Sequence, residues 1–220
     1  LSALGLMAAR VAHEIRNPLS SIKGFARFFA DKVPEGGGKE IAFTMMDAVD
    51  RLNRVVTELL DFARPSPLTF KPGDIREVID RAMRLTEDDA RKKGVEATFT
   101  AAPGLPALSM DFERLTQVFL NLFINAIQAM DQGGKLAVTA AAQGSRIAVT
   151  VSDTGQGMAP DVLDSIFTPY YTTKPAGTGL GLAIVLKILE EHDCEIKVES
   201  VPGQGTTFTL LFPEPPATQG

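Results

Sequence analysis

The sequence has little of several features on which other classes of protein depend. It contains 1 cysteine, Cys194, and 2 histidines among 220 residues. A single cysteine excludes an intrachain disulfide and a cysteine-based zinc site, and it is typical of a reducing compartment. No apolar run reaches the roughly 18 residues that a membrane-spanning helix needs, and no signal peptide opens the chain.

Positive charge is scarce as well. The 22 Lys and Arg residues are outnumbered by 27 Asp and Glu residues, which gives a formal net charge of −5. Nucleic-acid-binding proteins need clustered positive charge, so we expect no nucleic-acid partner. The chain begins with Leu1 rather than Met. We therefore expect a piece of a longer protein, in which only parts outside this chain contact a membrane.

Residues 1–64 predict two helices joined as a hairpin. Pro34 and three consecutive glycines within 33–40 predict the turn between them. Apolar residues recur at spacings of four and three, which is typical of a narrow coiled-coil seam. They are Leu4, Ala8, Val11, Ile15, Ile22, Phe25 and Phe29 in the first helix and Ile41, Met45, Ala48, Leu52, Val55, Leu59 and Phe62 in the second. Because such helices bury too little surface alone, we expect a homodimer in which two hairpins form a four-helix bundle.

A linker and a second domain are expected after the hairpin. Prolines at positions 65, 67 and 72 oppose helix formation, so residues 65–74 are the predicted linker. Residues 75–213 are the predicted second domain, and residues 214–220 are expected to be a disordered tail. Three helices are expected in this domain. The first has the apolar face Ile75, Val78, Ile79, Ala82 and Leu85; the second is N-capped by Asp111 and has the apolar face Phe112, Leu115, Phe119, Leu122 and Ala126; the third spans 179–191. Strands are expected at 95–101, 136–140, 147–151, 196–200 and 206–212. The chain is therefore predicted to be α+β, a helical hairpin followed by an α/β sandwich.

Three glycine-rich clusters lie in the last third of the chain, at 153–157, 177–182 and 203–208. Each can be a simple turn, since a short glycine motif is weak support for a ligand site. Alternatively, the cluster at 177–182 opens a helix, where free N–H groups and the helix dipole favour a phosphate. Asp153 ends a strand, so its carboxylate can accept a hydrogen bond from an amino group such as adenine N6.

Asn121 and Asn125 are four residues apart and share the polar face of their expected helix. A pair of asparagines at this spacing is commonly solvated surface. Their amide oxygens can alternatively complete a Mg²⁺ shell beside phosphate oxygens and water.

His13 lies on the polar side of the first expected helix. At about 100° per residue it shares a face with Asn17, Ser20 and Gly24. A histidine in this setting is commonly an ordinary surface residue. Alternatively, Glu14 takes the ring proton or holds its tautomer, and Asn17 reaches a water or phosphoryl oxygen near the imidazole.

Five motifs follow one another along the second half of the chain. They are NLFINA (121–126), DTGQG (153–157), IFTPYYTTK (166–174), GTGLGL (177–182) and GQGTTF (203–208). In this order they resemble the N, G1, F, G2 and G3 boxes of the Bergerat-type ATP-binding fold. Histidine kinases, Hsp90 chaperones, type II topoisomerases and mismatch-repair ATPases share that fold.

The resemblance implies that ATP and Mg²⁺ bind here. It implies Asn125 as the Mg²⁺ ligand with Asn121 close by, and Asp153, supported by Thr206, as the residue that reads the adenine amino group. Many relatives have a basic residue three positions after the metal-binding Asn, where this sequence has Gln128; we expect Lys174 to neutralise phosphate instead. The remaining expected nucleotide-site residues are Gly155 and Gly157 at the base, Phe167 under a mobile lid spanning 158–178, and Gly177, Gly179, Leu180 and Gly181 at the phosphates.

HEIRNPL (13–19) and SSIKGF (20–25) resemble the H-box of histidine kinases, so the total resemblance spans about residues 4–212. The nitrogen-regulation type of sensor kinase is the most similar subfamily. The resemblance implies that His13 attacks the γ-phosphorus of ATP while Glu14 takes the ring proton. The phosphoryl group then passes to an aspartate of a response-regulator receiver domain, for which an enhancer-binding activator is a candidate. Asn17 is expected to position a water that dephosphorylates the regulator, and the chain is expected to be the cytoplasmic portion of a bacterial sensor.

Two other functions stay open at this level. One is a Bergerat-fold ATPase or serine protein kinase without phosphohistidine. The other is a dimerisation module that binds nucleotide without turning it over. Away from these motifs, His192 is expected to be a cation that complements a helix end, and Cys194 to be a core residue.

Overall fold

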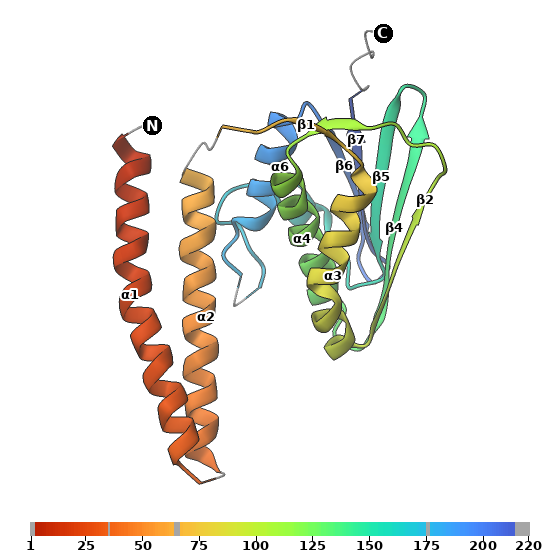
Figure 1. The fold of residues 1–220 in the computed structure, drawn as a ribbon. Coiled ribbons are helices and arrows are strands. Elements are labelled where there is room, and N and C mark those ends of the chain that lie inside the picture. The colour runs from red at the N-terminus through yellow and green to blue at the C-terminus, as the bar shows by residue number, and fades with distance from the viewer. Residues whose placement is uncertain (1–2, 35, 64–66, 175–176, 214–220) are drawn as a thin grey trace. The chain divides into compact units, whose positions relative to one another are not determined.

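The computed structural model describes residues 3–34, 36–63, 67–174 and 177–213, except for the side chains of 3–14, 51, 54 and 57–63. The chain divides into two compact units, Leu1–Pro67 and Leu68–Gly220, here named the hairpin and the sandwich unit (Figure 1). Among the described residues, no helix combines the length and the apolar character that crossing a membrane requires.

The hairpin consists of two long helices, as predicted. They are α1 (Ala3–Lys32) and α2 (Gly37–Ala63). The turn is shorter than the predicted 33–40 because α2 begins inside the glycine run. Gly36 has a φ of +144°, and its carbonyl accepts hydrogen bonds of 3.0 and 3.3 Å from two N–H groups of the first turn of α2.

The apolar stripe predicted from the sequence is not the one that packs inside the hairpin. The buried hairpin residues are Leu19, Ala26, Ala30, Ala42, Val49 and Val56. Seven members of the predicted seam are instead 40–73% exposed: Ile15, Ile22, Phe25, Phe29, Ile41, Met45 and Leu52. Small side chains let the two helices approach closely, and this leaves the larger apolar side chains on a neighbouring stripe. Periodicity detects an apolar stripe, but it does not identify the surface that covers it.

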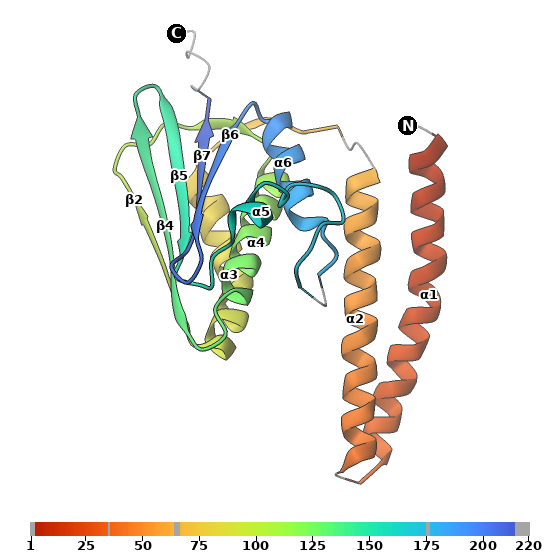
Figure 2. The same ribbon diagram turned by 180° about the vertical axis from the view of Figure 1, so that it is seen from behind.

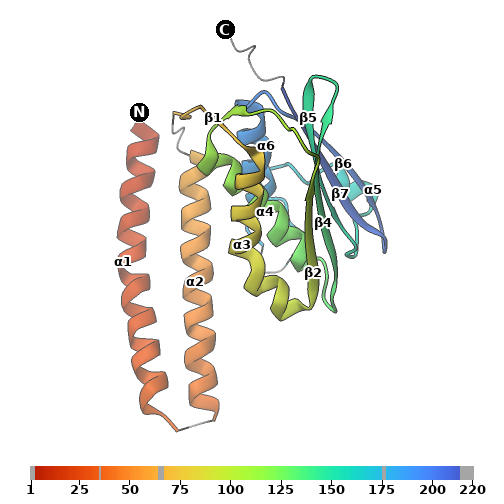
Figure 3. The same cartoon turned by 45° about the vertical axis from the view of Figure 1, so that its right-hand side comes forward.

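The sandwich unit places three helices on one face of a five-stranded sheet, which Figure 3 shows nearly edge-on. The strand order is β2-β4-β5-β7-β6; β2 and β4 are parallel and the other neighbours are antiparallel. The strands are β2 (Val95–Ala101), β4 (Gly134–Gln143), β5 (Arg146–Asp153), β6 (Glu195–Val201) and β7 (Gly205–Phe212). The helices are α3 (Ile75–Lys93), α4 (Phe112–Gln128) and α6 (Gly181–Glu191). The prediction of a hairpin followed by an α/β sandwich is confirmed.

The core lies between the sheet and these helices. Alternate residues of the central strands are buried, which is the period-2 pattern of a sheet covered on one face. They are Leu136, Val138, Ala140, Ile147, Val149, Val151, Phe208, Leu210 and Phe212. The α3 face was predicted correctly except at Leu85, which is 57% exposed. Thr86 and Ala90 continue the buried stripe instead. A step of four residues from Ala82 stays closer to the same helix face than a step of three, because one helical turn takes 3.6 residues.

Part of the predicted 65–74 linker is built into the sandwich unit. β1 (Lys71–Gly73) pairs antiparallel with β3 (Leu108–Met110), and the Thr69 N–H donates to the Asp111 carboxylate at 2.8 Å. Residues 64–66 and the predicted tail at 214–220 lie outside the described residues. In the described chain, the segment before the sandwich unit is therefore shorter than the sequence predicted.

Candidate functional site

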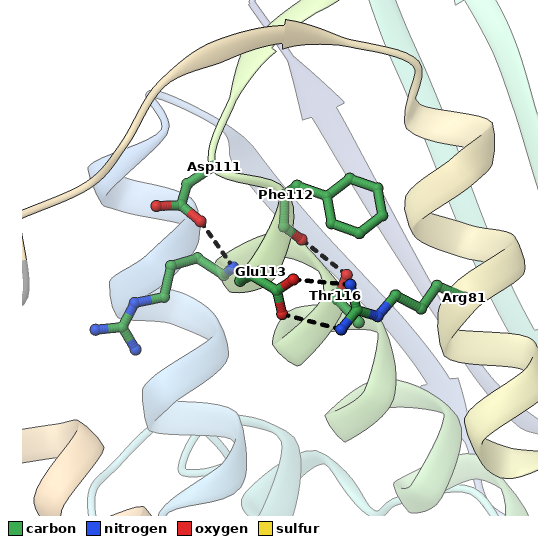
Figure 4. Close-up of polar contacts among 6 residues, drawn as sticks. Arg81, Asp111, Phe112, Glu113 and Thr116 are labelled. Carbon is green, nitrogen blue, oxygen red and sulfur yellow. Dashed lines mark hydrogen bonds and ion pairs between the residues drawn. The ribbon is translucent and has the colours of Figure 1, made fainter.

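The start of α4 is held firmly, and this fixes the helix that carries Asn121 and Asn125. The Asp111 carboxylate caps the helix by accepting from the Arg114 N–H at 3.1 Å. Arg81 of α3 donates to both oxygens of Glu113, at 2.7 and 3.2 Å (Figure 4). The Thr116 hydroxyl donates to the Phe112 carbonyl at 2.7 Å. These contacts join α4 to α3 and orient its polar face.

Of the two asparagines on the polar face of α4, Asn121 contacts the cluster at 177–182. Both side chains are half-buried. The Asn121 Nδ2 donates to the carbonyl of Gly181 at 3.4 Å, which places the first turn of α6 beside the middle of α4. An amide face and a helix N-terminus thus lie together in the sandwich unit.

Asp153 ends β5 as a buried carboxylate, 7% exposed. Its Oδ1 accepts a hydrogen bond of 2.8 Å from the Gly155 N–H. Burial raises the pKa of Asp153, while N–H groups of Gly155 and Thr206 act in the opposite direction. Thr206 is its partner in the β5–β7 register, so the two residues predicted to recognise a base are neighbours.

Most of the predicted glycines are required by close contacts within the protein itself. A Cβ on Gly155 would lie 2.8 Å from Ala129, and one on Gly157 would lie 2.0 Å from the Val201 carbonyl. On Gly179 it would lie 2.4 Å from the Tyr170 backbone, and on Gly177 2.3 Å from the Thr172 hydroxyl. Only ordinary contacts surround Gly181, where the nearest atom, of Asn121, would be 3.8 Å away. Contacts within the protein therefore explain the glycines at positions 155, 157, 177 and 179. At Gly181, by contrast, the fold itself has room for a side chain.

The segment between β5 and α6 contains a short helix, α5 (Pro160–Leu163), which Figure 2 shows from behind. Phe167 is half-buried, next to the buried Ile166. Leu180 is 1% exposed, so its side chain belongs to the core, and only its backbone is available to a ligand.

Lys174, on this segment, reaches back to α4. Its Nζ donates to the Asn125 Oδ1 at 3.2 Å and to the Gln128 Oε1 at 2.9 Å. Burial lowers the pKa of Lys174, and the Asp153 carboxylate opposes this effect. A cation, two amide oxygens and a buried carboxylate thus come from three parts of the sandwich unit: the segment before α6, the helix α4 and the end of β5.

Sequence reasoning missed Ser200 of β6. Its hydroxyl accepts from the Met158 N–H at 2.8 Å and lies 2.9 Å from the Thr206 hydroxyl. It also donates to the Gly205 carbonyl at 3.0 Å. Ser200 thus connects the segment after Asp153 to the strand that carries Thr206. A lone serine near the end of a strand offers no sequence signal of this role.

The phospho-acceptor candidates lie in the hairpin. His13 and Glu14 are within α1, but their side chains lie outside the described part of the structure. Asn17 follows one turn later and is exposed, and α1 continues through Pro18. Ser20 and Gly24, on the same helical face, are also exposed.

His192 is not the helix-end cation that the sequence predicted. It is 5% exposed, its Nδ1 lies 2.7 Å from the Ile188 carbonyl, and its Nε2 accepts from the Asp111 N–H at 3.1 Å. Because Nε2 is an acceptor, the ring is neutral, and burial lowers its pKa. Its ring also lies 5.0 Å from that of Phe70. Cys194 is buried as expected, and burial raises its thiol pKa to about 12.

Comparison with known families identifies both units. Residues 3–67 match the family described as "His Kinase A (phospho-acceptor) domain". Residues 110–216 match the family described as "Histidine kinase-, DNA gyrase B-, and HSP90-like ATPase".

Curated relatives match nearly the whole chain. The sensor histidine kinase ZraS of Escherichia coli (strain K12) is 50% identical over 97% of this chain and 46% of that protein. Sporulation kinase C of Bacillus subtilis (strain 168) is 36% identical over 97% of this chain and 50% of that protein. The chain thus spans about half the length of these relatives.

Solved structures share the fold. Full-length ShkA in complex with AMPPNP has a TM-score of 0.81 at 30% identity, over 98% of this chain and 47% of that one. ThkA in complex with the response regulator TrrA has a TM-score of 0.71 at 31% identity, over 100% of this chain and 64% of that one. The catalytic domain of ThkA alone has a TM-score of 0.62 at 31% identity, over 67% of this chain and 97% of that one. The chain therefore belongs to the sensor histidine kinases and contains the phospho-acceptor hairpin and the ATP-binding catalytic domain of that family.

Proposed function

We propose that this chain binds ATP with Mg²⁺, phosphorylates His13 and passes the phosphoryl group to an aspartate of a response regulator. One observation carries the proposal: Asp153, Asn125 and Lys174 gather in the sandwich unit of a chain whose hairpin carries HEIRNPL. The first three provide a base acceptor, a metal-ligand amide and a phosphate-binding cation. The hairpin provides the nucleophile.

Asp153 suits the adenine amino group. An ionised carboxylate accepts hydrogen bonds but has no proton with which to donate one. Guanine presents a carbonyl where adenine presents its amino group, so Asp153 would select ATP over GTP. Thr206 lies beside it in the β5–β7 register and supports the same recognition.

The donor set also suits Mg²⁺. The metal prefers oxygen ligands and keeps several waters, so one amide oxygen with phosphate oxygens is sufficient. The Asn125 Oδ1 already accepts from the Lys174 ammonium, which indicates that this oxygen can face a cation. Bound Mg²⁺ would supply positive charge to the phosphates. Asn121 stands one turn earlier and fastens α4 to α6 through the Gly181 carbonyl.

In the hairpin, His13 is the proposed nucleophile and Glu14 the group that accepts its ring proton. Asn17, exposed one turn later, is proposed to position water for dephosphorylation of the regulator. The polar and small residues around it, Ser20 and Gly24, leave space for either a nucleotide-bearing domain or a receiver.

We propose that two copies pair through their hairpins. The exposed apolar stripe, which includes Ile22, Phe25 and Phe29, runs along a helix face that a single hairpin leaves open. Contiguous apolar patches of this kind mark interaction sites in soluble proteins. A second copy covers them by forming a four-helix bundle, the expected homodimer.

The proposed partner is a receiver domain, in line with the ThkA complex that contains the regulator TrrA. We propose that this receiver domain is part of an enhancer-binding activator. Because both ATP and receiver domains are found in the cytoplasm, we propose that the chain acts there as the kinase portion of a bacterial sensor.

The test is incubation with γ-labelled ATP and Mg²⁺ of the parent chain and of His13→Gln. The parent should acquire acid-labile, base-stable label and His13→Gln none. Nucleotide affinity and circular dichroism should be unchanged in the variant, which separates lost chemistry from lost folding. Base-labile, acid-stable label would identify a serine kinase, and ATP hydrolysis without label an ATPase. Binding with neither label nor hydrolysis would identify a dimerisation module, and each of these three outcomes overturns the proposal.

A further inference from the structure

We infer that Gln128 is a positioning residue that holds the Lys174 ammonium beside Asn125, so that the two residues set nucleotide affinity as one unit. The inference rests on the proposed function, because it concerns the same nucleotide site. Gln128 is the last residue of α4 and was expected only to lack the charge found there in many relatives.

The contacts define the unit. Lys174 Nζ lies 2.9 Å from the Gln128 Oε1 and 3.2 Å from the Asn125 Oδ1, and these two residues are one helical turn apart on α4. An ammonium group has three N–H donors. Two are accepted by these amides, which leaves one for a phosphate oxygen. The amides thus fix the direction in which the remaining donor points.

The backbone of Lys174 is held as well. Its N–H donates to the Thr172 hydroxyl at 3.1 Å, and its carbonyl accepts from the Gly177 N–H at 3.0 Å. The turn therefore fixes where the side chain begins, and the α4 amides fix where it ends. A lysine without such restraint would lose more side-chain freedom on binding a ligand. Much of that ordering is already present here.

The neutrality of Gln128 matters for the charge of the site. Burial lowers the pKa of Lys174, the Asp153 carboxylate raises it, and Lys93 lowers it. A carboxylate at position 128 would pair with the ammonium and repel phosphate, whereas an ammonium there would repel Lys174. An amide oxygen stabilises the charged lysine and leaves its full charge for the nucleotide.

The experiment is a double-mutant cycle on the full chain, with Gln128→Leu, Lys174→Met and the double variant. The affinity for ATP with Mg²⁺ is measured by calorimetry. We expect Lys174→Met to weaken binding about tenfold and Gln128→Leu about threefold to tenfold, the range of one charge-assisted hydrogen bond. In the Lys174→Met background, Gln128→Leu should have no further effect, because its only role is to hold the lysine. Gln132→Leu, an exposed glutamine in the next loop, is the matched control and should bind normally.

Adenosine binding separates positioning from a structural role, because adenosine carries the base but no phosphate for the Lys174 ammonium. Gln128→Leu and Lys174→Met should bind adenosine as the parent does, whereas a damaged site would lose affinity for adenosine as well. Additive effects in the cycle, or weakened adenosine binding, would overturn the inference. Because the readout is binding, it stands or falls separately from the labelling of His13.

Discussion

The Nε2 of His192 accepts a hydrogen bond from the backbone N–H of Asp111, 3.1 Å away and 81 positions earlier in the chain. His192 is the C-cap of α6, and Asp111 is the N-cap of α4. The neutral imidazole therefore joins the ends of these two helices, and the Asp111 carboxylate joins α4 to the Thr69 N–H of the entering segment.

The sandwich unit should lose stability as the pH falls from about 7 to about 5. Burial lowers the pKa of His192 in the folded state, with Asp111 and Glu191 opposing and Arg114 assisting. The unfolded chain therefore binds a proton at His192 at a pH where the folded chain does not, which favours unfolding as pH drops below about 6.5. His192→Gln keeps an acceptor but does not titrate, so it should flatten this slope while destabilising the unit by about 1 kcal/mol at neutral pH. Urea unfolding across this range is the measurement; an equal flattening in His13→Gln, the control, would contradict the assignment.

Asp153→Asn should stabilise the nucleotide-free protein and abolish ATP binding. Burial raises the pKa of Asp153 in the folded state. Its contribution to stability is therefore most favourable while the carboxyl is neutral, and it is lost as the pH rises from the carboxyl's ordinary pKa through the pKa in the folded protein. At neutral pH the buried carboxylate thus opposes folding. Asparagine still accepts from Gly155 and carries no charge. At neutral pH we expect a melting temperature higher by about 2–4 °C, the shift for about 1 kcal/mol in a unit of this size. ATP should no longer raise it, and a parent-like thermal shift with ATP would remove Asp153 from the base site.

Gly181→Ala should fold normally and bind ATP poorly. Its Cβ would meet nothing closer than 3.8 Å, so the methyl group has room in the protein but occupies the space in front of the α6 N-terminus, beside Asn121. Gly179→Ala should instead lower the melting temperature, since its Cβ would lie 2.4 Å from the Tyr170 backbone and Gly179 has a φ of +70°. We expect about a tenfold loss of affinity in the first and about 1–3 kcal/mol of destabilisation in the second. Parent affinity in Gly181→Ala would show that no ligand approaches there.

Ile22→Glu should convert a dimer into a monomer. Ile22 lies on the exposed apolar stripe at 41% exposure, so the single hairpin does not need it, but a second copy would bury the new charge. Phe28→Glu is the matched control because Phe28 is 64% exposed and lies on a different side of α1. Light scattering at micromolar concentration should give half the parent mass for Ile22→Glu and the parent mass for the control. A monomeric parent would rule out the bundle.

Asn17→Ala should retain autophosphorylation and lose dephosphorylation of the regulator. Its side chain is exposed, so truncation leaves the hairpin core intact. A residue that only positions water should reduce the hydrolytic step by about 10²–10³-fold. The decay of the phosphorylated regulator, measured with each variant, is the readout. Undiminished decay would exclude Asn17 from this role.

Much of this protein was determined locally. The Asp111 cap, the hairpin of β4 and β5 and the buried faces of α3 and α4 follow from interactions between residues two to four positions apart, which periodicity and capping residues record directly. The order of the motifs was likewise enough to expect a nucleotide site with Asn125 and Asp153. For these elements sequence reasoning succeeded because the interacting groups are close in the chain, with Leu85 of α3 as an exception.

Other features were decided only by tertiary packing. Lys174 meets Gln128 across 46 positions, and His192 becomes a neutral acceptor because Asp111 arrives from another helix. The hairpin buries Ala26, Ala30 and Ala42 rather than the stripe that contains Ile22, because the close approach of two helices favours small side chains between them. A local pattern states which residues need a partner. Which partner each one receives, and with what charge, depends on the dielectric surroundings and shape that exist only once distant segments are packed together.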